Sequence, residues 1–132
     1  ASKYLETASP NVFGDAFKKT NPGVIQNVID SGTDISPEAM IQFVMAMRNR
    51  KAYTHLLTNN RIPIWMIVGE DDIAVPIEDS LKQLQLLPQN RVMLLKQVGH
   101  MGMLEATEQV NNALLGFIQA AELLANRPKQ MV

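Results

Sequence analysis

The chain contains no cysteine, which excludes disulfide bonds and metal sites built from thiolates. It also lacks a run rich in lysine and arginine, and its formal net charge is −1, so nucleic acid is not an expected partner. Its longest fairly apolar run, residues 113–125, is too short to span a bilayer and is typical of a core helix. The first ten residues lack the apolar core of a signal peptide. We therefore expect a cytoplasmic protein that does not bind membranes.

The chain does contain enough apolar sequence for one small domain. Of its 132 residues, 46% are hydrophobic and 19% are charged, a balance that can bury a core and is not typical of disorder. Its two parts differ in pattern. Residues 1–60 show helical periodicity and no confident strand, whereas residues 61–132 alternate between strand and helix patterns.

Residues 1–60 predict a helical segment. A first helix is expected within residues 21–32, and a second begins with Ser36 as N-cap, Pro37 in the first helical position and Glu38 at the positive end of the helix dipole. The apolar residues expected on the inner faces of these helices are Val24, Ile25, Val28, Ile29, Met40, Ile41, Val44, Met45 and Met47. Arg48, Arg50 and Lys51 are expected on a solvated face, and His55 near a helix end.

Residues 61–132 predict strand, helix, strand and helix in that order. The strands are 62–68 and 91–98, both nearly continuous in apolar residues, and the helices are 77–87 and 107–126. Trp65 is expected in the core of the sheet. The side chains expected to face inward from the two helices are Ile77, Leu81, Leu84, Leu87, Val110, Leu114, Leu115, Ile118 and Leu123.

A strand, a helix and a strand within so few residues form a βαβ unit, and the two strands of such a unit are parallel. Two strands are too few for a sheet of this class, which usually has about four to six. We therefore infer that part of the sheet lies outside this sequence, in an N-terminal segment or in a second copy of the chain.

Polar residues follow both predicted strands. Glu70, Asp71 and Asp72 come after the first, and His100 comes after the second. In parallel sheets, sites form beyond the carboxyl ends of the strands. If the strands are neighbours, a carboxylate can reach the imidazole, fix its tautomer and make it a competent general base.

These segments resemble the α/β-hydrolase family. "IPIWMIVGEDDIAVP" is similar to that family's seventh strand and acid loop, with G-x-x-D-x-x-x-P at Gly69, Asp72 and Pro76. "VGHMGMLEATEQVNNALLGFI" is similar to its histidine loop and last helix. "FVMAMRNRKAYTHLLTNNRIPIW" is similar to the end of its helical cap. The fold class expected is thus α/β, a partial α/β-hydrolase fold with a cap-derived helical segment at 1–60 and the C-terminal part of the hydrolase core at 61–132.

The resemblance implies that Asp72 is the triad acid and His100 the base, with no metal and no cofactor. Glu70 and Asp71 match variable positions and are expected to be solvated. Glu105, five residues after His100, is expected to hold the histidine loop or the helix start rather than to take part in chemistry. Thr107 stands where the family often has proline, and threonine can cap the helix instead. Met101 and Met103, which flank His100, fit a pocket wall or the core equally well.

One part of the family pattern is absent. The family's nucleophile lies in G-x-S-x-G between a strand and a helix, and no serine here has that setting: Ser2, Ser9, Ser31, Ser36 and Ser80. The expected function is therefore that of the C-terminal fragment of an α/β-hydrolase-like enzyme acting on a small, apolar, ester-like substrate, inactive without a nucleophile from elsewhere. The alternative is a ligand-binding or self-associating module of the same fold without catalysis.

Overall fold

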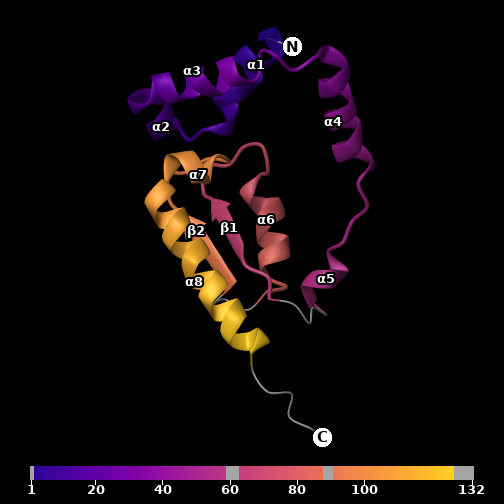
Figure 1. Ribbon diagram of the computed structural model, residues 1–132, viewed down its shortest axis with the longest axis vertical. Helices are drawn as coiled ribbons and strands as arrows, with labels where there is room; N and C mark the ends of the chain where they lie inside the picture. The colour runs from indigo at the N-terminus through magenta and orange to yellow at the C-terminus, as the bar shows by residue number, and fades with distance from the viewer. Residues whose placement is uncertain (1, 59–62, 88–90, 127–132) are drawn as a thin grey trace, which may run out of the picture.

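The computed structural model describes residues 2–58, 63–87 and 91–126. In chain order the helices are α1 (Ser2–Ala8), the short 3-10 helix η1 (Ser9–Val12), α2 (Asp15–Thr20), α3 (Pro22–Ser31), α4 (Pro37–Asn49), α5 (His55–Thr58), α6 (Ile77–Leu84), α7 (Gly102–Glu105) and α8 (Thr107–Ala125). The strands are β1 (Met66–Gly69), before α6, and β2 (Val92–Leu95), after it. Figure 1 shows α8 and α6 on opposite sides of the strands, and α1–α3 beyond the ends to which the strands point.

The two strands are parallel neighbours, as the sequence predicts. Met66 pairs with Val92 and Gly69 with Leu95, and α6 makes the connection between the strands. Both strands are shorter than expected. Gln97 takes a positive φ of 59°, which turns the chain out of the ladder after β2. At the other end, Ile62 lies outside the described residues, and residues 63–65 precede the first paired residue, Met66.

The helix between the strands is also shorter than the predicted 77–87. It ends at Leu84, and the next two turns are closed by bonds of the tighter i→i+3 type, from the N–H of Leu86 to the Gln83 carbonyl and from that of Leu87 to the Leu84 carbonyl. Pro88 follows, and a residue before proline is disfavoured in the α region. Leu87 is nevertheless buried as expected, whereas Leu81 is exposed.

The described residues form two small apolar cores. The sheet core joins Leu95, Val98 and Val110, with Ile67 and Met93 packed against it, so it lies between the strands and α8. The N-terminal core joins Phe13, Ile25 and Ile29, with Val28 at its edge, and the ring of Phe13 stacks on Phe17 at 5.5 Å between centroids. The helix face predicted within residues 21–32 is thus the one that packs. Trp65 contacts Phe117 of α8, with ring centroids 5.8 Å apart, just before β1.

The inward face predicted for α8 is mostly wrong. Val110 is buried as expected, but Leu114, Leu115, Ile118 and Leu123 are all exposed. The face of α8 on the sheet is formed instead by Val110, Ala113 and Phe117, which follow helical spacing. The helix therefore has a second apolar stripe, turned away from β1 and β2, that no described residue buries.

The start of α4 is as predicted, but its packing is not. The Ser36 hydroxyl accepts a hydrogen bond from the Ala39 N–H at 3.1 Å. The backbone N–H of Glu38 and then the Ser36 hydroxyl hold the pKa of the Glu38 carboxyl below its ordinary value. No residue of α4 is buried, and the expected core residues Ile41, Val44, Met45 and Met47 are exposed. Figure 1 shows the reason, because α4 stands away from the sheet, beyond α6.

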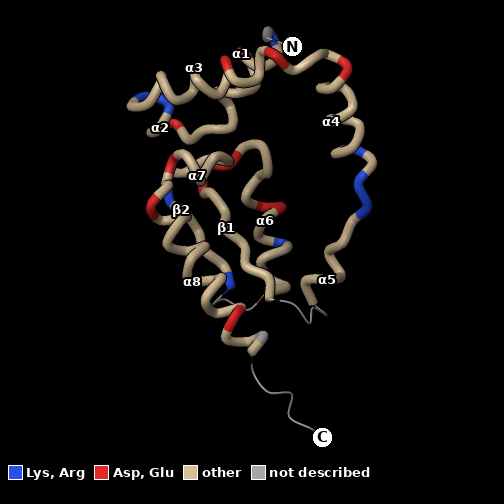
Figure 2. The backbone as a smooth tube through the Cα atoms, viewed as in Figure 1, with Lys and Arg blue, Asp and Glu red and all other residues tan. Residues whose placement is uncertain are grey.

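The basic residues around the end of α4 are solvated as expected, since Arg48, Arg50 and Lys51 are all exposed. Figure 2 shows blue segments there, on the outer side of the molecule. None of the helices within the described ranges is both long and apolar enough to cross a membrane.

The described part of the chain is a helix-rich α/β fold with a parallel sheet of two strands. All of its strand residues follow position 60, but the division there into cap and core stays a prediction.

We expect Gly69→Ala to destabilise the chain. A Cβ atom at this strand end would overlap the backbone oxygens of Val98 and Gly99, and backbone cannot move aside cheaply. The expected loss is about 2 kcal/mol or more in the free energy of unfolding, measured by urea denaturation. Gly116→Ala is the matched control, because a Cβ there meets nothing within 4 Å and alanine should stabilise α8 by about 1 kcal/mol. Equal stability of Gly69→Ala and the parent chain would contradict the close approach of the two loops.

Candidate active site

Two loops meet at the carboxyl edge of the sheet. The N–H of Glu70 donates to the carbonyl of Leu95, and the N–H of Asp71 donates to the carbonyl of Val98, each at 2.9 Å. The Glu70 side chain also accepts from the N–H of Gln97 at 3.2 Å. The loop after β1 is thus joined by hydrogen bonds to the loop after β2. Glu70 is exposed as expected, but it contributes to this joint, which the sequence did not indicate.

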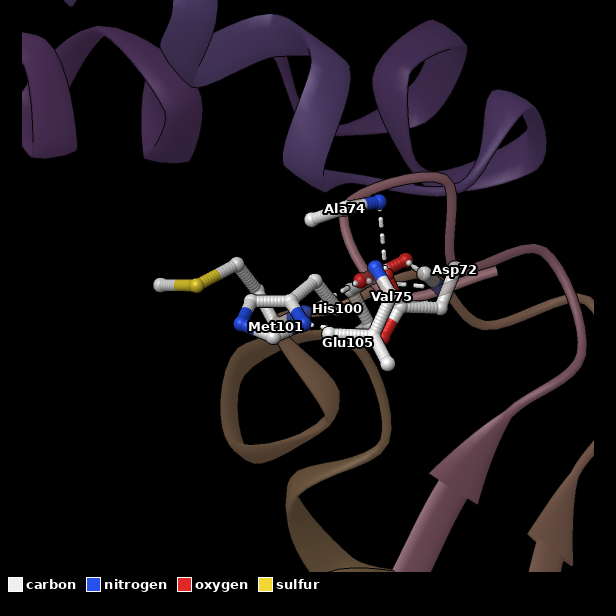
Figure 3. A network of polar contacts seen from close by, with 7 residues as sticks. Asp72, Ala74, Val75, His100, Met101 and Glu105 are labelled. Atoms are coloured by element: carbon white, nitrogen blue, oxygen red, sulfur yellow. Dashed lines mark hydrogen bonds and ion pairs between the residues drawn. The ribbon is translucent and has the colours of Figure 1, made fainter. Parts of the chain in front are cut away.

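The joined loops bring Asp72 to His100. Oδ2 of Asp72 lies 2.8 Å from Nδ1 of His100, which confirms the contact expected from the sequence (Figure 3). The other oxygen, Oδ1, accepts the N–H groups of Ala74 and Val75, each at 2.9 Å. An ionised carboxylate only accepts hydrogen bonds, so Nδ1 carries the proton in this contact and the lone pair of the neutral ring is on Nε2.

The two side chains differ in exposure. The side chain of Asp72 is 10% exposed and that of His100 is 44% exposed, so the carboxylate is covered while the ring is open to an incoming group. A cavity of about 220 Å³ lies beside the pair. Its lining includes the apolar residues Met66, Val68, Val75 and Leu95, and one serine, Ser80 of α6. The arrangement can orient a histidine and present it as a general base to a small apolar compartment.

Glu105 holds the histidine loop, as expected. Oε2 accepts the N–H of Gly14 at 2.8 Å and that of Gly99 at 3.0 Å. Oε1 accepts from Gly99 at 3.1 Å and from Met101 at 3.2 Å. The side chain is half-buried and binds the backbone on both sides of His100, whereas the ring itself is hydrogen-bonded to Asp72 (Figure 3).

The segment 12–14 is also part of this site, which sequence reasoning missed. The N–H of His100 donates to the carbonyl of Val12 at 2.8 Å. Gly14 and Gly99 are in contact through their backbones, since a Cβ on Gly99 would lie 2.6 Å from the Gly14 nitrogen. No local sequence pattern predicts these contacts. The two segments are almost ninety positions apart, and the atoms in contact belong to the main chain, which is the same in every residue.

Three smaller expectations are corrected or decided by the structure. Met101 packs against the N-terminal core and Met103 is 56% exposed, so neither lines the cavity beside His100. Thr107 does not cap α8: its hydroxyl donates back to the Met103 carbonyl at 2.8 Å, because α7 runs almost directly into α8. His55 is the first residue of α5, far from His100 in the fold.

Within the ranges described, no group of three or more potential ligands is placed to hold a metal ion.

Comparison with known proteins identifies hydrolases. No family model matches the chain. A 2-hydroxy-6-oxononadienedioate/2-hydroxy-6-oxononatrienedioate hydrolase from a Pseudomonas species is 29% identical over 85 residues, which make up 62% of this chain and 30% of that protein. A putative carbamate hydrolase, RutD, from Acinetobacter baylyi is 31% identical over 64 residues, 48% of this chain and 24% of that protein.

Solved structures show the same fold. A thermophilic esterase from Thermogutta terrifontis matches with a TM-score of 0.79 at 22% identity, over 89% of this chain and 43% of the esterase. MGS-M2, an α/β-hydrolase from a Medee basin deep-sea metagenome library, matches with a TM-score of 0.67 at 16% identity, over 89% of this chain and 48% of that enzyme. The chain thus spans less than half the length of each of these enzymes.

We expect Asp72→Asn to change the tautomer of His100. The carboxylate requires a proton on Nδ1, whereas an asparagine amide can donate to Nδ1 and so permits the proton on Nε2. Ring-nitrogen chemical shifts of the neutral histidine, measured by NMR, distinguish the two forms. Asp71→Asn is the matched control, because Asp71 is adjacent and exposed, and it should leave the shifts unchanged. A parent chain with its His100 proton mainly on Nε2 would contradict the contact.

Proposed function

Since the chain has the α/β-hydrolase fold over part of its length, we propose that it is the C-terminal portion of an enzyme of that type and carries the acid and base of its catalytic triad. The observation that supports this is the 2.8 Å contact between Asp72 and His100 on the loops after two adjacent parallel strands. The acid precedes the histidine along the chain, which is the order of this fold's triad.

The proposed chemistry divides the work between the two residues. His100 accepts a proton at Nε2 from a nucleophile supplied from outside this sequence and gives it to the leaving group. In a second step it accepts a proton from water and returns it to the nucleophile when the covalent intermediate is cleaved. Asp72 keeps the ring in the required tautomer and stabilises the imidazolium that forms. The small cavity and its apolar walls support a small, apolar substrate, and the likeness to an esterase supports an ester-like one. The proposal needs neither a metal nor an organic cofactor. The cytoplasmic location expected from the sequence stays a prediction.

The serines of this chain do not fit the role of the nucleophile. Ser80 lines the same cavity, but it lies inside α6 and its N–H is bonded to the carbonyl of Pro76. A nucleophile in this fold needs backbone N–H donors aimed at the oxyanion, and Ser80 therefore lacks the support that a strand-to-helix turn gives.

The missing part is proposed to be the N-terminal half of the hydrolase. Among described residues, β1 has a strand partner on one edge only, and the second stripe of α8, including Leu114 and Ile118, is exposed. Exposed edges and apolar stripes of this kind are normally covered. In the matched enzymes more than half of the chain lies outside the region of similarity. A second copy of this chain could cover the same surfaces and is the competing partner.

The alternative function is a self-associating or ligand-binding module without catalysis. The free edge of β1 favours it, because edge strands of two copies can pair. Size-exclusion chromatography with light scattering distinguishes a self-associating module from a fragment that lacks its N-terminal half. A concentration-independent dimer of the bare chain would favour self-association over a missing N-terminal half.

A chimera tests the catalytic proposal. The part of the Thermogutta terrifontis esterase that this chain does not cover would be joined to this chain, and hydrolysis of a short-chain nitrophenyl ester would be followed. We expect the bare chain to be inactive. In the chimera we expect His100→Ala and Asp72→Asn each to lower kcat/KM by about a thousandfold or more, since the acid and base of a triad act as a unit.

His55→Ala in the chimera is the matched control, because this histidine is on α5, away from the site, and activity should be retained. Two results would contradict the proposal. One is ester hydrolysis by the bare chain that is lost in His100→Ala or Ser80→Ala, which would place the nucleophile within this sequence. The other is an active chimera that does not respond to His100→Ala.

A further inference from the structure

The backbone around His100 is bonded to groups outside its own loop at three successive positions. The N–H groups of Gly99 and Met101 donate to Glu105, and that of His100 donates to the carbonyl of Val12. Nothing in this arrangement touches the imidazole itself. The bonds instead fix the position of the main chain from which the ring projects toward Asp72.

The same carboxylate also binds the N-terminal helices. Its Oε2 accepts the N–H of Gly14, on the segment between η1 and α2. Met101 adds an apolar link, because it packs against the N-terminal core of Phe13, Ile25 and Ile29. The attachments between the helices α1–α3 and the histidine loop thus include the Glu105 carboxylate, the main-chain bond from His100 to Val12 and the side chain of Met101. Figure 1 shows these helices lying across the edge of the sheet where the loop emerges.

We propose that Glu105 is a positioning residue that couples the docking of α1–α3 to the orientation of His100. A displacement of the helices moves Gly14 and Val12, and Glu105 transmits it to Gly99 and Met101 on either side of His100. The ring then loses its alignment with Asp72. The inference rests on the proposed function, in which this alignment matters, and it adds that the helical segment controls whether the acid and base are assembled.

The chemistry of the side chain makes the coupling testable. Within the described part of the chain, the donors that reach Glu105 are backbone N–H groups, and both of its oxygens are used. Glutamine keeps the shape but replaces one acceptor oxygen by an NH₂ group, which is itself a donor. Whichever way the amide turns, either Gly14 or Met101 loses its acceptor. Glu105→Gln must therefore remove one of the hydrogen bonds by which this side chain holds the helical segment or the histidine loop.

The test is NMR on the uniformly labelled chain. In Glu105→Gln we expect amide exchange at Gly14 or at Met101 to be roughly tenfold faster or more, since hydrogen bonds to a charged group are among the stronger ones. We also expect the ring-nitrogen shifts of His100 to move away from the form protonated at Nδ1. Glu108→Gln is the matched control, because Glu108 lies three residues on and is exposed, and both readouts should stay at the parent values.

A second variant approaches the same contact from the other side. In Gly14→Ala the added Cβ would lie 2.8 Å from the Gln97 carbonyl oxygen and 3.0 Å from Oε2 of Glu105, so it pushes the helices off the loop while Glu105 stays intact. The same change in His100 is expected. This variant decides the question if Glu105→Gln does not fold.

Two outcomes would overturn the coupling. One is faster exchange at Gly14 or Met101 with unchanged His100 shifts, which would make Glu105 structural only. The other is no change in either readout. Asp72→Asn, measured alongside, keeps this failure distinct from that of the proposed function. If Asp72→Asn alters the His100 shifts and Glu105→Gln does not, the pair stands and only the coupling is wrong. If neither alters them, the pair itself is not formed.

Discussion

The close approach of the two loops that leave β1 and β2 is the constraint on which the site depends. Parallel pairing in the register of Gly69 with Leu95 places both strand ends at one edge. The absence of a side chain at Gly69 then lets the end of β1 pass against the backbone of Val98 and Gly99, where a Cβ would collide with carbonyl oxygens. The absence of one at Gly99 lets the segment 12–14 approach the same loop. Because the two loops are joined by main-chain hydrogen bonds, the backbones that carry Asp72 and His100 retain little conformational freedom. The histidine is therefore oriented before any substrate or further chain arrives.

The sequence was informative wherever the signal was local. The apolar runs ending at Gly69 and before Gly99 predict two buried strands, the spacing between them predicts the parallel connection, and polar residues after each strand predict the site. The N-cap at Ser36 followed from residue type alone. Contacts of main-chain atoms distant in sequence were beyond this reasoning. The bond from His100 to the Val12 carbonyl and that from Gly14 to Glu105 depend on how a helical segment lies over the sheet, and no residue type specifies that.

The errors in predicted burial have one physical origin. Helical periodicity in α4 and in α8 correctly identifies apolar faces, but a periodic pattern does not say which element covers each face. In α8 one stripe, through Val110 and Ala113, lies on this sheet, while the stripe containing Leu114 and Ile118 is exposed. Apolar side chains at helical spacing that nothing covers are what a helix shows when part of its surroundings is elsewhere. The same misplaced predictions therefore support the proposal that further strands and helices complete the fold.

Asp72 and Glu105 both meet the chain around His100, and their partners explain why only Asp72 is proposed to take part in the chemistry. The two oxygens of Asp72 have different partners: Oδ1 accepts two N–H groups of its own turn, and Oδ2 faces a ring that would change charge in the proposed proton transfer. Among the residues that the structure describes, Glu105 is hydrogen-bonded to backbone N–H groups alone, whose charge does not change. The first can stabilise an imidazolium as it forms, and the second can only hold a position. A carboxylate beside a histidine is thus assigned by what it contacts rather than by its distance along the chain.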